Sequence, residues 1–289
     1  MIPPEFEYLR PATIPEAVSL LQLHGDDAKI LSGGQSLIPM MKLRLARPAW
    51  LIDINHIPGL AYIREEGGYL KIGGLTREAD VENSELIRAK YPIVHDTALV
   101  IADPQVRNLA TMGGNLAHGD PANDHGATML ALEAELVATG ANGQRTIAVR
   151  DFFLSIFTTA LEQDEILTEI RIPVPAARSG GTYLKLERKV GDFATAAVAA
   201  QVTLDASGAC TKAGIGVTNA GPTPIKAGKA EAFLRGKRLD AASVAQAAEL
   251  AMGESQPSSD LRGPAEYKKG LVKELTKRAL TRAAERAGR

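Results

Sequence analysis

The 289-residue chain is too long for one ordinary hydrophobic core, so its length predicts two or three structural units. Its 45% hydrophobic and 23% charged residues are ordinary for a folded protein, and they exclude collagen-like, disordered and disulfide-rich classes. With 33 basic and 34 acidic side chains the formal net charge is -1, so no long-range field attracts a phosphate backbone or an anionic membrane. Nucleic acid is therefore not an expected partner.

The cysteine count limits the metal chemistry of this chain. Cys210 is alone, so the chain cannot form an intramolecular disulfide, a multi-cysteine zinc site or an iron-sulfur cluster with four thiolate ligands. The N-terminal residues lack a basic region followed by an apolar core, and no window holds eighteen uncharged apolar residues. We therefore expect no transmembrane segment and a cytoplasmic location, with which peripheral association at the inner face of the membrane is compatible.

The first part of the chain predicts alternating strands and helices. Thr13 and Glu16 have the spacing of a capping box, and the apolar stripe behind them predicts a helix that stops near Gly25. The patterns that follow predict a strand at 28–31, a short helix within 37–45, strands at 50–54 and 69–74, and helical segments at 76–84 and 85–102, interrupted by Pro92.

Strands are expected to dominate the rest. Asp120 and Pro121 fit the N-cap and first residue of a helix over 122–136. Strands are predicted at 135–140, 144–149, 165–174, 182–189, 196–204 and 210–219, before two helical stretches, the last over 265–288. Proline and glycine accumulate at 173–181, so we expect a domain boundary near residue 176.

Two glycine doublets, at 33–34 and 113–114, share one context. Each follows a hydroxyl side chain and precedes a hydroxyl or amide side chain; the flanking residues are Ser32, Ser36, Thr111 and Asn115. Adjacent glycines allow positive φ and expose successive backbone N–H groups, which can bind an anion. Neither doublet matches G-x-G-x-x-G or the triphosphatase motif. We interpret the doublets at 33–34 and 113–114 as two halves of one phosphate clamp, with plain turns as the alternative. We interpret the other doublets, at 67–68, 73–74 and 180–181, as plain turns.

Four stretches of the sequence resemble a known family. SGGQSLIPMMKLRLARPAWLIDIN (32–55) and IADPQVRNLATMGGNLAHGDPANDH (101–125) resemble the two flavin-binding segments of the FAD-carrying medium subunit of molybdenum hydroxylases, the xanthine dehydrogenase family. The resemblance continues in RKVGDFATAA (188–197) and GPAEYKKGL (263–271), so it covers nearly the whole chain. Within that family the sequence is most similar to medium subunits of aerobic carbon monoxide dehydrogenases.

The resemblance implies an α+β fold in two domains. A two-lobed FAD-binding domain of the vanillyl-alcohol-oxidase type (PCMH-type) would span 1–175, with lobes of roughly 1–55 and 56–175. A smaller α+β domain, like the C-terminal domain of carbon monoxide dehydrogenase flavoproteins, would span 176–289. The two glycine loops would bind the FAD pyrophosphate through neutral donors, without a lysine. The implied cofactor-binding residues are Ser32, Gly33, Gly34, Gln35, Ser36, Leu37, Ile101, Ala110, Thr111, Gly113, Gly114, Asn115, Asp124, Leu161, Lys185 and Phe193.

Some of these residues have individual expectations. A carboxylate repels pyrophosphate, so Asp124 is assigned to ribose hydroxyls or to fixing a loop. Lys185 is expected near the isoalloxazine edge, where a cation stabilises reduced flavin; surface solvation is its alternative. Phe193 is expected to shield an isoalloxazine face, with a core position as the alternative. Many carbon monoxide dehydrogenase subunits have tyrosine at the Phe193 position and histidine at that of Gln35, and both departures bear on the substrate.

The family resemblance also implies partners. A large subunit would carry the molybdenum pterin cofactor and a small subunit two 2Fe-2S clusters, assembled as a dimer of heterotrimers. Substrate chemistry would take place in the large subunit, and this chain, with no catalytic residue and no metal ligand of its own, would pass electrons through FAD to a quinone or another acceptor. Carbon monoxide is the leading substrate, with N-heterocycles such as nicotine or purines, and aldehydes, as alternatives. A stand-alone flavin oxidase and a non-enzymatic flavin or nucleotide storage module remain open as other classes.

Three competing patterns receive less weight. His118, Asp120, Asp124 and His125 are possible metal-ligand types, but they lack regular i, i+4 spacing, and a helix start explains Asp120 better. No G-x-S-x-G motif supports a serine hydrolase. The segment from Lys268 to Arg289 carries eight basic residues, and we expect a solvated or subunit-facing helix rather than an RNA or membrane surface.

Overall fold

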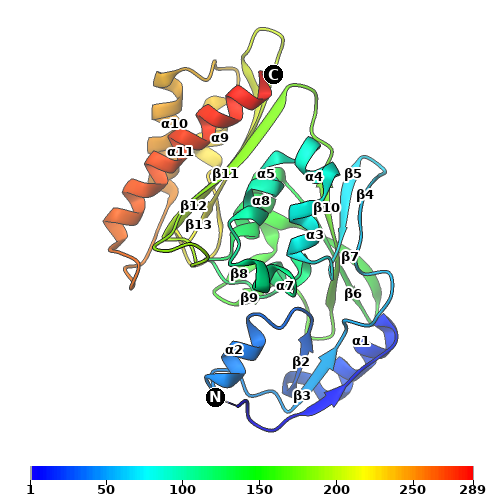
Figure 1. Cartoon of the computed structure of the whole chain (residues 1–289). Helices are drawn as coiled ribbons and strands as arrows, with labels where there is room; N and C mark the ends of the chain where they lie inside the picture. Colours follow the sequence, from blue (N-terminus) through cyan, green and yellow to red (C-terminus); the bar gives the residue numbers. More distant parts are fainter. Residues whose placement is uncertain (1, 289) are drawn as a thin grey trace.

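The structure is a computed structural model that describes residues 2–288. The N-terminal part, at the blue end of Figure 1, contains a 3-stranded parallel sheet of order β1-β3-β2. Its elements are β1 (Glu7–Leu9), α1 (Ile14–His24), a 3-10 turn (Gly25–Asp27), β2 (Ala28–Leu31), α2 (Leu37–Lys42) and β3 (Trp50–Asp53). The Thr13 side chain accepts the Glu16 N–H at the start of α1, which confirms the predicted cap. The strand β1 had no counterpart in the sequence prediction.

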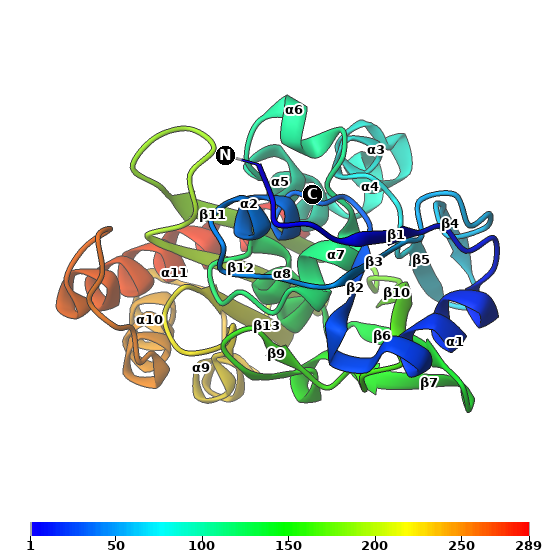
Figure 2. The ribbon, with the colours of Figure 1, turned by 90° about the horizontal axis from the view of Figure 1, so that it is seen from below.

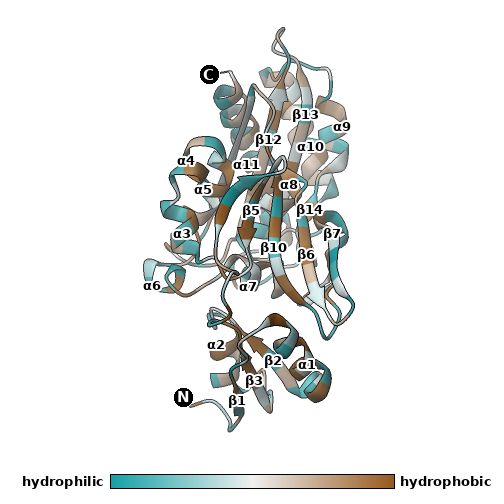
Figure 3. Ribbon diagram, turned by 90° about the vertical axis from the view of Figure 1, so that its right-hand side faces the viewer, coloured by the Kyte–Doolittle hydropathy of each residue, from teal (hydrophilic) through white to brown (hydrophobic). Residues whose placement is uncertain are grey.

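A second sheet lies in the middle of the molecule, beyond a narrow connection that Figure 3 shows. It is 5-stranded, of order β4-β5-β10-β6-β7, with antiparallel pairs throughout. Its strands are β4 (Ile63–Glu66), β5 (Tyr69–Gly73), β6 (Glu135–Gly140), β7 (Gly143–Ala148) and β10 (Ile166–Pro173). Leu70, Ile72 and Ile170 are fully buried in the main core, so one face of this sheet is covered by helices.

Those helices follow β5 in the chain. They are α3 (Glu78–Asn83), α4 (Glu85–Lys90), α5 (Pro92–Leu99), α6 (Pro104–Arg107), α7 (Met112–Ala117) and α8 (Asp124–Leu132). Pro92 starts α5, so the predicted interruption is confirmed. A 3-10 turn (Val149–Asp151) and the two-stranded ribbon β8 (Phe153–Ser155) and β9 (Thr158–Thr159) complete this part.

The C-terminal part is a 4-stranded antiparallel sheet of order β11-β12-β13-β14. Its elements are β11 (Ser179–Leu186), β12 (Ala196–Leu204), β13 (Cys210–Thr218), β14 (Ile225–Lys226), α9 (Gly228–Leu234), α10 (Ala241–Glu254) and α11 (Ala265–Ala287). Side chains of β12 alternate between two cores: Val198 belongs to the core beneath α9, α10 and α11, and Ala197 to the core of the middle part. The C-terminal sheet is therefore a shared layer between two sets of helices (Figure 1).

Two local predictions were wrong. Helix α8 starts at Asp124 with Asn123 as its N-cap, whereas the Asp120 carboxylate accepts the N–H of Ala122 in a preceding turn. The doublets at 73–74 and 180–181 are not plain turns. They lie in or beside strands, where an added Cβ would collide with neighbouring backbone at 73, 74 and 180 and with the Gln201 side chain at 181. A Cβ on Gly74 would lie 2.2 Å from the Leu167 carbonyl oxygen. The doublet at 67–68 has positive φ at both residues and is a turn, as predicted.

Helix α11 is amphipathic and packs on β11 and β12. Val272, Ala279 and Leu280 are fully buried, while most of its basic side chains point away from this core. No helix within residues 2–288 is long and apolar enough to cross a membrane.

Candidate functional site

The first glycine doublet lies in the loop between β2 and α2. Gly34 has φ +71, which a residue with a side chain rarely adopts, so the predicted positive φ is found here. Backbone N–H groups from Gly33 through Leu37 have no hydrogen-bond acceptor within residues 2–288. The Ser36 hydroxyl does not cap α2. This loop therefore has a run of unpaired N–H donors that an anionic ligand could accept.

The second doublet has a different structure. Gly113 and Gly114 belong to the first turn of α7, and their N–H groups are used inside the protein. Gly113 donates to the Gly74 carbonyl over 2.9 Å, and Gly114 donates to Thr111 Oγ1 over 3.1 Å. The expectation that this doublet forms a positive-φ nest of free amides was wrong. Glycine is needed because a Cβ on Gly113 would lie 2.6 Å from the Gly74 carbonyl oxygen.

The two segments nevertheless meet, as predicted. A Cβ on Gly33 would lie 2.4 Å from the Leu109 carbonyl oxygen and 2.8 Å from the Cα of Ala110. Ser32 Oγ lies 3.3 Å from Thr111 Oγ1. In Figure 1 and in Figure 2, β2 lies next to α7. Two segments separated by nearly eighty residues thus form one junction.

The polar groups of this junction suit a phosphate-containing ligand. Besides the free amides, it offers the hydroxyls of Ser32 and Thr111. Asn115 Oδ1 is buried without a hydrogen-bond partner within residues 2–288; as an acceptor it would pair with a donor group of a ligand rather than with a phosphate oxygen. Neutral hydrogen-bond donors therefore dominate the two loops, in agreement with the sequence-based expectation.

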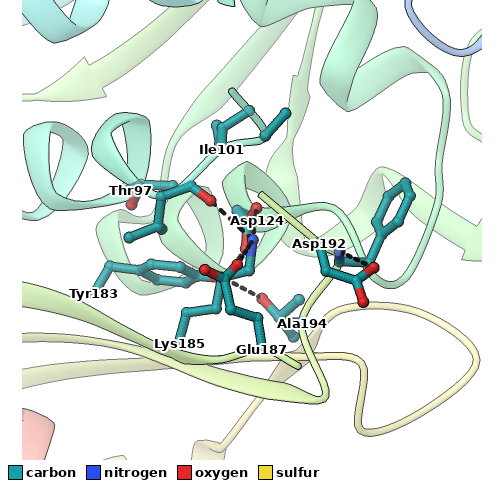
Figure 4. A network of polar contacts seen from close by, with 12 residues as sticks. Thr97, Ile101, Asp124, Tyr183, Lys185, Glu187, Asp192 and Ala194 are labelled. Carbon is teal, nitrogen blue, oxygen red and sulfur yellow. Dashed lines mark hydrogen bonds and ion pairs between the residues drawn. The ribbon is translucent and has the colours of Figure 1, made fainter. Parts of the chain in front are cut away.

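A second polar cluster joins α8 to the C-terminal sheet (Figure 4). Tyr183 donates its hydroxyl to Asp124 Oδ1 over 2.6 Å, and Lys185 Nζ lies 3.1 Å from Asp124 Oδ2. Lys185 also donates to the Val100 carbonyl over 2.9 Å and lies 3.4 Å from Glu187 Oε2. Both oxygens of Asp124 thus have protein partners, which favours the loop-fixing role over ribose binding.

The electrostatics of this cluster follow from its burial. Burial raises the pKa of Asp124, and the neighbouring ammonium of Lys185 acts in the opposite direction. Burial beside Asp124 raises the pKa of the Tyr183 hydroxyl well above its ordinary value, so the phenol remains a donor. The Lys185 side chain is only 2% exposed, which makes the surface-solvation alternative wrong.

Phe193 lies in the loop between β11 and β12 and is 44% exposed, so it is not a core aromatic. The guanidinium of Arg262 lies 5.5 Å from its ring centroid and pairs with Asp192 over 2.9 Å. Gly191 approaches the backbone of Ala102, where its Cβ would lie 3.0 Å from the carbonyl oxygen. The loop thus lies beside the segment that carries Ile101, which is buried, whereas Leu161 is half-buried farther along the chain.

The weaker metal pattern is not assembled. Within residues 2–288 no group of three or more His, Cys, Asp or Glu side chains could hold a metal ion. His118 packs against Phe157, with ring centroids 5.0 Å apart. His125 is fully buried and pairs with Glu78 over 2.8 Å. These side chains face different neighbours and do not converge.

Comparison with known proteins decides the family. Residues 4–175 match the family described as the FAD binding domain in molybdopterin dehydrogenase. Residues 181–283 match the CO dehydrogenase flavoprotein C-terminal domain. The chain belongs to this flavoprotein family. The resemblance stated from the sequence is confirmed, and so are the expected fold and the assignment as an FAD-binding oxidoreductase subunit.

Individual relatives of this flavoprotein cover the whole chain. It is 46% identical over 284 residues to the carbon monoxide dehydrogenase medium chain of Hydrogenophaga pseudoflava, covering 98% of both sequences. It is 37% identical to the 6-hydroxypseudooxynicotine dehydrogenase complex subunit alpha of Paenarthrobacter nicotinovorans, with 99% and 97% coverage. A solved structure of carbon monoxide dehydrogenase from Hydrogenophaga pseudoflava matches with TM-score 0.97 and 48% identity over 99% of each chain.

Sequence reasoning missed three residues that hydrogen-bond the candidate site residues or one another: Asn55, Arg77 and Tyr183. Asn55 lies two residues after β3 at the same sheet edge as the first glycine loop, and this position was a usable signal. Arg77 and Tyr183 reach the site only through tertiary packing, so no local pattern could have identified them.

Proposed function

We propose that this flavoprotein binds the FAD diphosphate at the junction of the two glycine segments. The observation that carries the proposal is the run of unpaired N–H groups from Gly33 to Leu37, which lies against Leu109 and Ala110. Gln35 contributes its main-chain N–H, since its side chain donates to the Gly33 carbonyl over 3.2 Å. Thr111 and Asn115 would add side-chain hydrogen bonds from the other segment.

The remaining predicted residues would position the rest of the cofactor. Ile101, beside the loop that carries Gly191, and Phe193, within that loop, would contact the flavin, and we assign Leu161 a further apolar contact. Asp124 and Lys185 would act together, because each is the other's ion-pair partner. Bound FAD supplies one-electron and two-electron chemistry; the protein contributes binding, orientation and the local field. We also propose a domain boundary near residue 176, supported by family matches that end at 175 and resume at 181.

We propose aerobic carbon monoxide oxidation as the activity of the complex. Identity of 46% to carbon monoxide dehydrogenase medium chains, against 37% for the pseudooxynicotine relative, supports this substrate over N-heterocycles. The molybdenum pterin cofactor and the 2Fe-2S clusters would reside in a large and a small partner subunit, in a dimer of heterotrimers within the cytoplasm. A quinone would accept the electrons. The lone Cys210, which is buried, agrees with clusters held elsewhere.

Anaerobic reduction of the flavin tests this proposal. The chain should be purified alone and also co-expressed with its large and small partner subunits. Flavin absorbance near 450 nm is then followed after adding carbon monoxide, nicotine, a purine or an aldehyde. We expect bleaching by carbon monoxide in the complex alone. Bleaching by an N-heterocycle instead would identify the complex as an N-heterocycle dehydrogenase of the same family. Turnover by the isolated chain would contradict the subunit assignment in favour of a stand-alone oxidase, and flavin that no partner can reduce would favour a storage module.

A further inference from the structure

Asn55 connects the first glycine segment to the parallel sheet. Its Nδ2 donates to the Ser32 carbonyl over 2.8 Å and to Asp53 Oδ1 over 2.7 Å. Its own N–H donates to the same Asp53 oxygen over 2.9 Å. With its amide nitrogen used in this way, Asn55 Oδ1 is left as an acceptor for a donor from elsewhere. Two hydrogen bonds of Nδ2 therefore set the orientation of the amide, and the backbone bond holds Asn55 against Asp53.

Arg77 completes the connection from the other lobe. Its Nη2 donates to Asn55 Oδ1 over 2.7 Å, and its Nη1 donates to the Leu109 carbonyl. That carbonyl is the group that a Cβ on Gly33 would strike. The Arg77 backbone also pairs with Thr111 in an isolated antiparallel bridge. One guanidinium therefore contacts the sheet side and the α7 side of the same junction.

The charge of this side chain matters because the two glycine segments themselves are neutral; the carboxylates of Asp53 and Asp80 lie near Arg77 and offset part of its charge. Neither 32–37 nor 109–117 contains a lysine or arginine. Arg77 enters from outside both segments, directly before α3. A guanidinium stays protonated and presents several N–H donors in one plane, so it can bridge two acceptors and still contribute its charge to a nearby anion.

We propose that Arg77 and Asn55 form a two-residue bridge that fixes the separation of the glycine segments and places a positive charge beside the bound diphosphate. Both are positioning residues for the cofactor. The inference rests on the proposed flavin site and adds to it a contact between the lobes and a source of charge. A lysine at position 77 retains the charge but loses the planar fork, and a methionine loses both.

The test uses the full chain co-expressed with its partner subunits, from which FAD has been removed, and titrates FAD back by fluorescence quenching. We expect Arg77→Met and Asn55→Ala each to raise the Kd for FAD about tenfold, which corresponds to about 1.4 kcal/mol. Arg77→Lys should recover part of the affinity. The double variant should be no more than about threefold weaker than the weaker single variant, because residues that act as one unit are not additive. The Kd of Arg77→Met should also depend less on salt than that of the wild type, a change that a purely structural defect would not produce.

Arg88→Met on the exposed face of α4 is the matched control, and it should leave the Kd unchanged. The bridge is overturned if the double variant shows the product of the two single effects, or if Arg77→Met binds FAD as tightly as the wild type. If the Kd of Arg77→Met depended on salt as strongly as that of the wild type, the Arg77 charge would not act on the bound diphosphate. A wild-type complex that takes up no FAD would instead contradict the proposed function, so the two failures are distinguishable.

Discussion

Gly33 is the residue at which the two glycine segments come closest. A side chain there meets main-chain atoms of Leu109 and Ala110, which cannot rotate away as a flexible side chain can. Glycine is required at this position by the partner segment rather than by its own φ. At Gly34, the next residue, glycine is required instead by the backbone conformation, which has a positive φ of +71. Adjacent glycines thus have separate physical reasons.

We expect Gly33→Ala to raise the Kd for FAD about tenfold, because overpacking of this kind costs about 1–3 kcal/mol. The flavin-to-protein ratio after purification and a fluorescence titration measure the effect. Gly270→Ala is the matched control: Gly270 lies in α11 with open space around its Cβ position, and this change should leave FAD binding intact while stabilising the helix by about 0.5–1 kcal/mol. Undiminished flavin content in Gly33→Ala would mean that the segments can separate without loss.

Asp192 gives a pH dependence with a defined sign. Its hydrogen bond with Arg262 lowers the pKa of the carboxyl from 3.8 to about 2. The unfolded chain therefore binds the proton more readily between these values, and the stabilisation is present above pH 4 and lost as the pH falls toward 2. Allowing for solvent screening, the contribution is about 1 kcal/mol.

Urea unfolding of the wild type and of Asp192→Asn at several pH values checks this prediction. The two midpoints should differ at pH 6 and converge as the pH falls from 4 to 2. Arg262→Gln should show the same reduced acid sensitivity as Asp192→Asn. A constant difference between wild type and Asp192→Asn down to pH 2 would contradict the ion-pair explanation.

At the scale of elements, small residues in the C-terminal sheet allow close packing on both faces. Strand β12 directs alternate side chains to different cores, and β11 brings its backbone against α11. A Cβ on Gly180 would lie 2.3 Å from both the Ala283 carbonyl oxygen and the Ala287 nitrogen. Gly180 is therefore the position in β11 at which the strand backbone lies directly against α11.

We predict that Gly180→Ala lowers the free energy of unfolding by about 1–3 kcal/mol, since the added methyl group must displace helix backbone. Thermal unfolding and hydrogen exchange in α11 measure it, and faster exchange in the last turns of that helix is the specific signature. Gly253→Ala in α10 is the control, because nothing lies within 4 Å of its Cβ position. Equal effects of the two substitutions would argue against the close approach.

At the scale of the whole molecule, a polar contact closes the C-terminal helix onto the FAD-binding part. Arg286 near the end of α11 contacts Asp96 of α5 over 2.6 Å and also donates to the Gly181 carbonyl. Thr182 donates its hydroxyl to the same carboxylate over 2.5 Å. Residues 190 positions apart in the sequence thus share a half-buried ion pair.

A double-mutant cycle with Asp96→Asn and Arg286→Met tests this contact. We expect a coupling energy of about 1–2 kcal/mol, because the pair is partly shielded from water and hydrogen-bonded at both ends. Unfolding midpoints of the four proteins give the value. The exposed pair of Arg278 and Glu274 on α11 provides a comparison that should couple by less than about 0.5 kcal/mol. A coupling energy that small between Asp96 and Arg286 would mean that their ion pair does not hold α11 to the FAD-binding part.

The sequence alone determined the family, the order of most elements and the segments that form the site. Periodicity and capping residues are local properties, so the helix at Thr13 and the break at Pro92 could be predicted. The meeting of the two doublets could also be predicted, because their common context suggested one ligand. The start of α8 could not, since Asp120 and Asn123 are both acceptable caps and only packing selects between them.

Tertiary structure alone decided how each group is used. It showed that the amides of 113–114 are already paired, that Lys185 and Asp124 form an ion pair, and that the Arg77 guanidinium donates to the Leu109 carbonyl and to Asn55 Oδ1. Hydrogen-bond partners come from segments distant in sequence, so a donor that is free in one loop and occupied in another cannot be distinguished by the residues beside it.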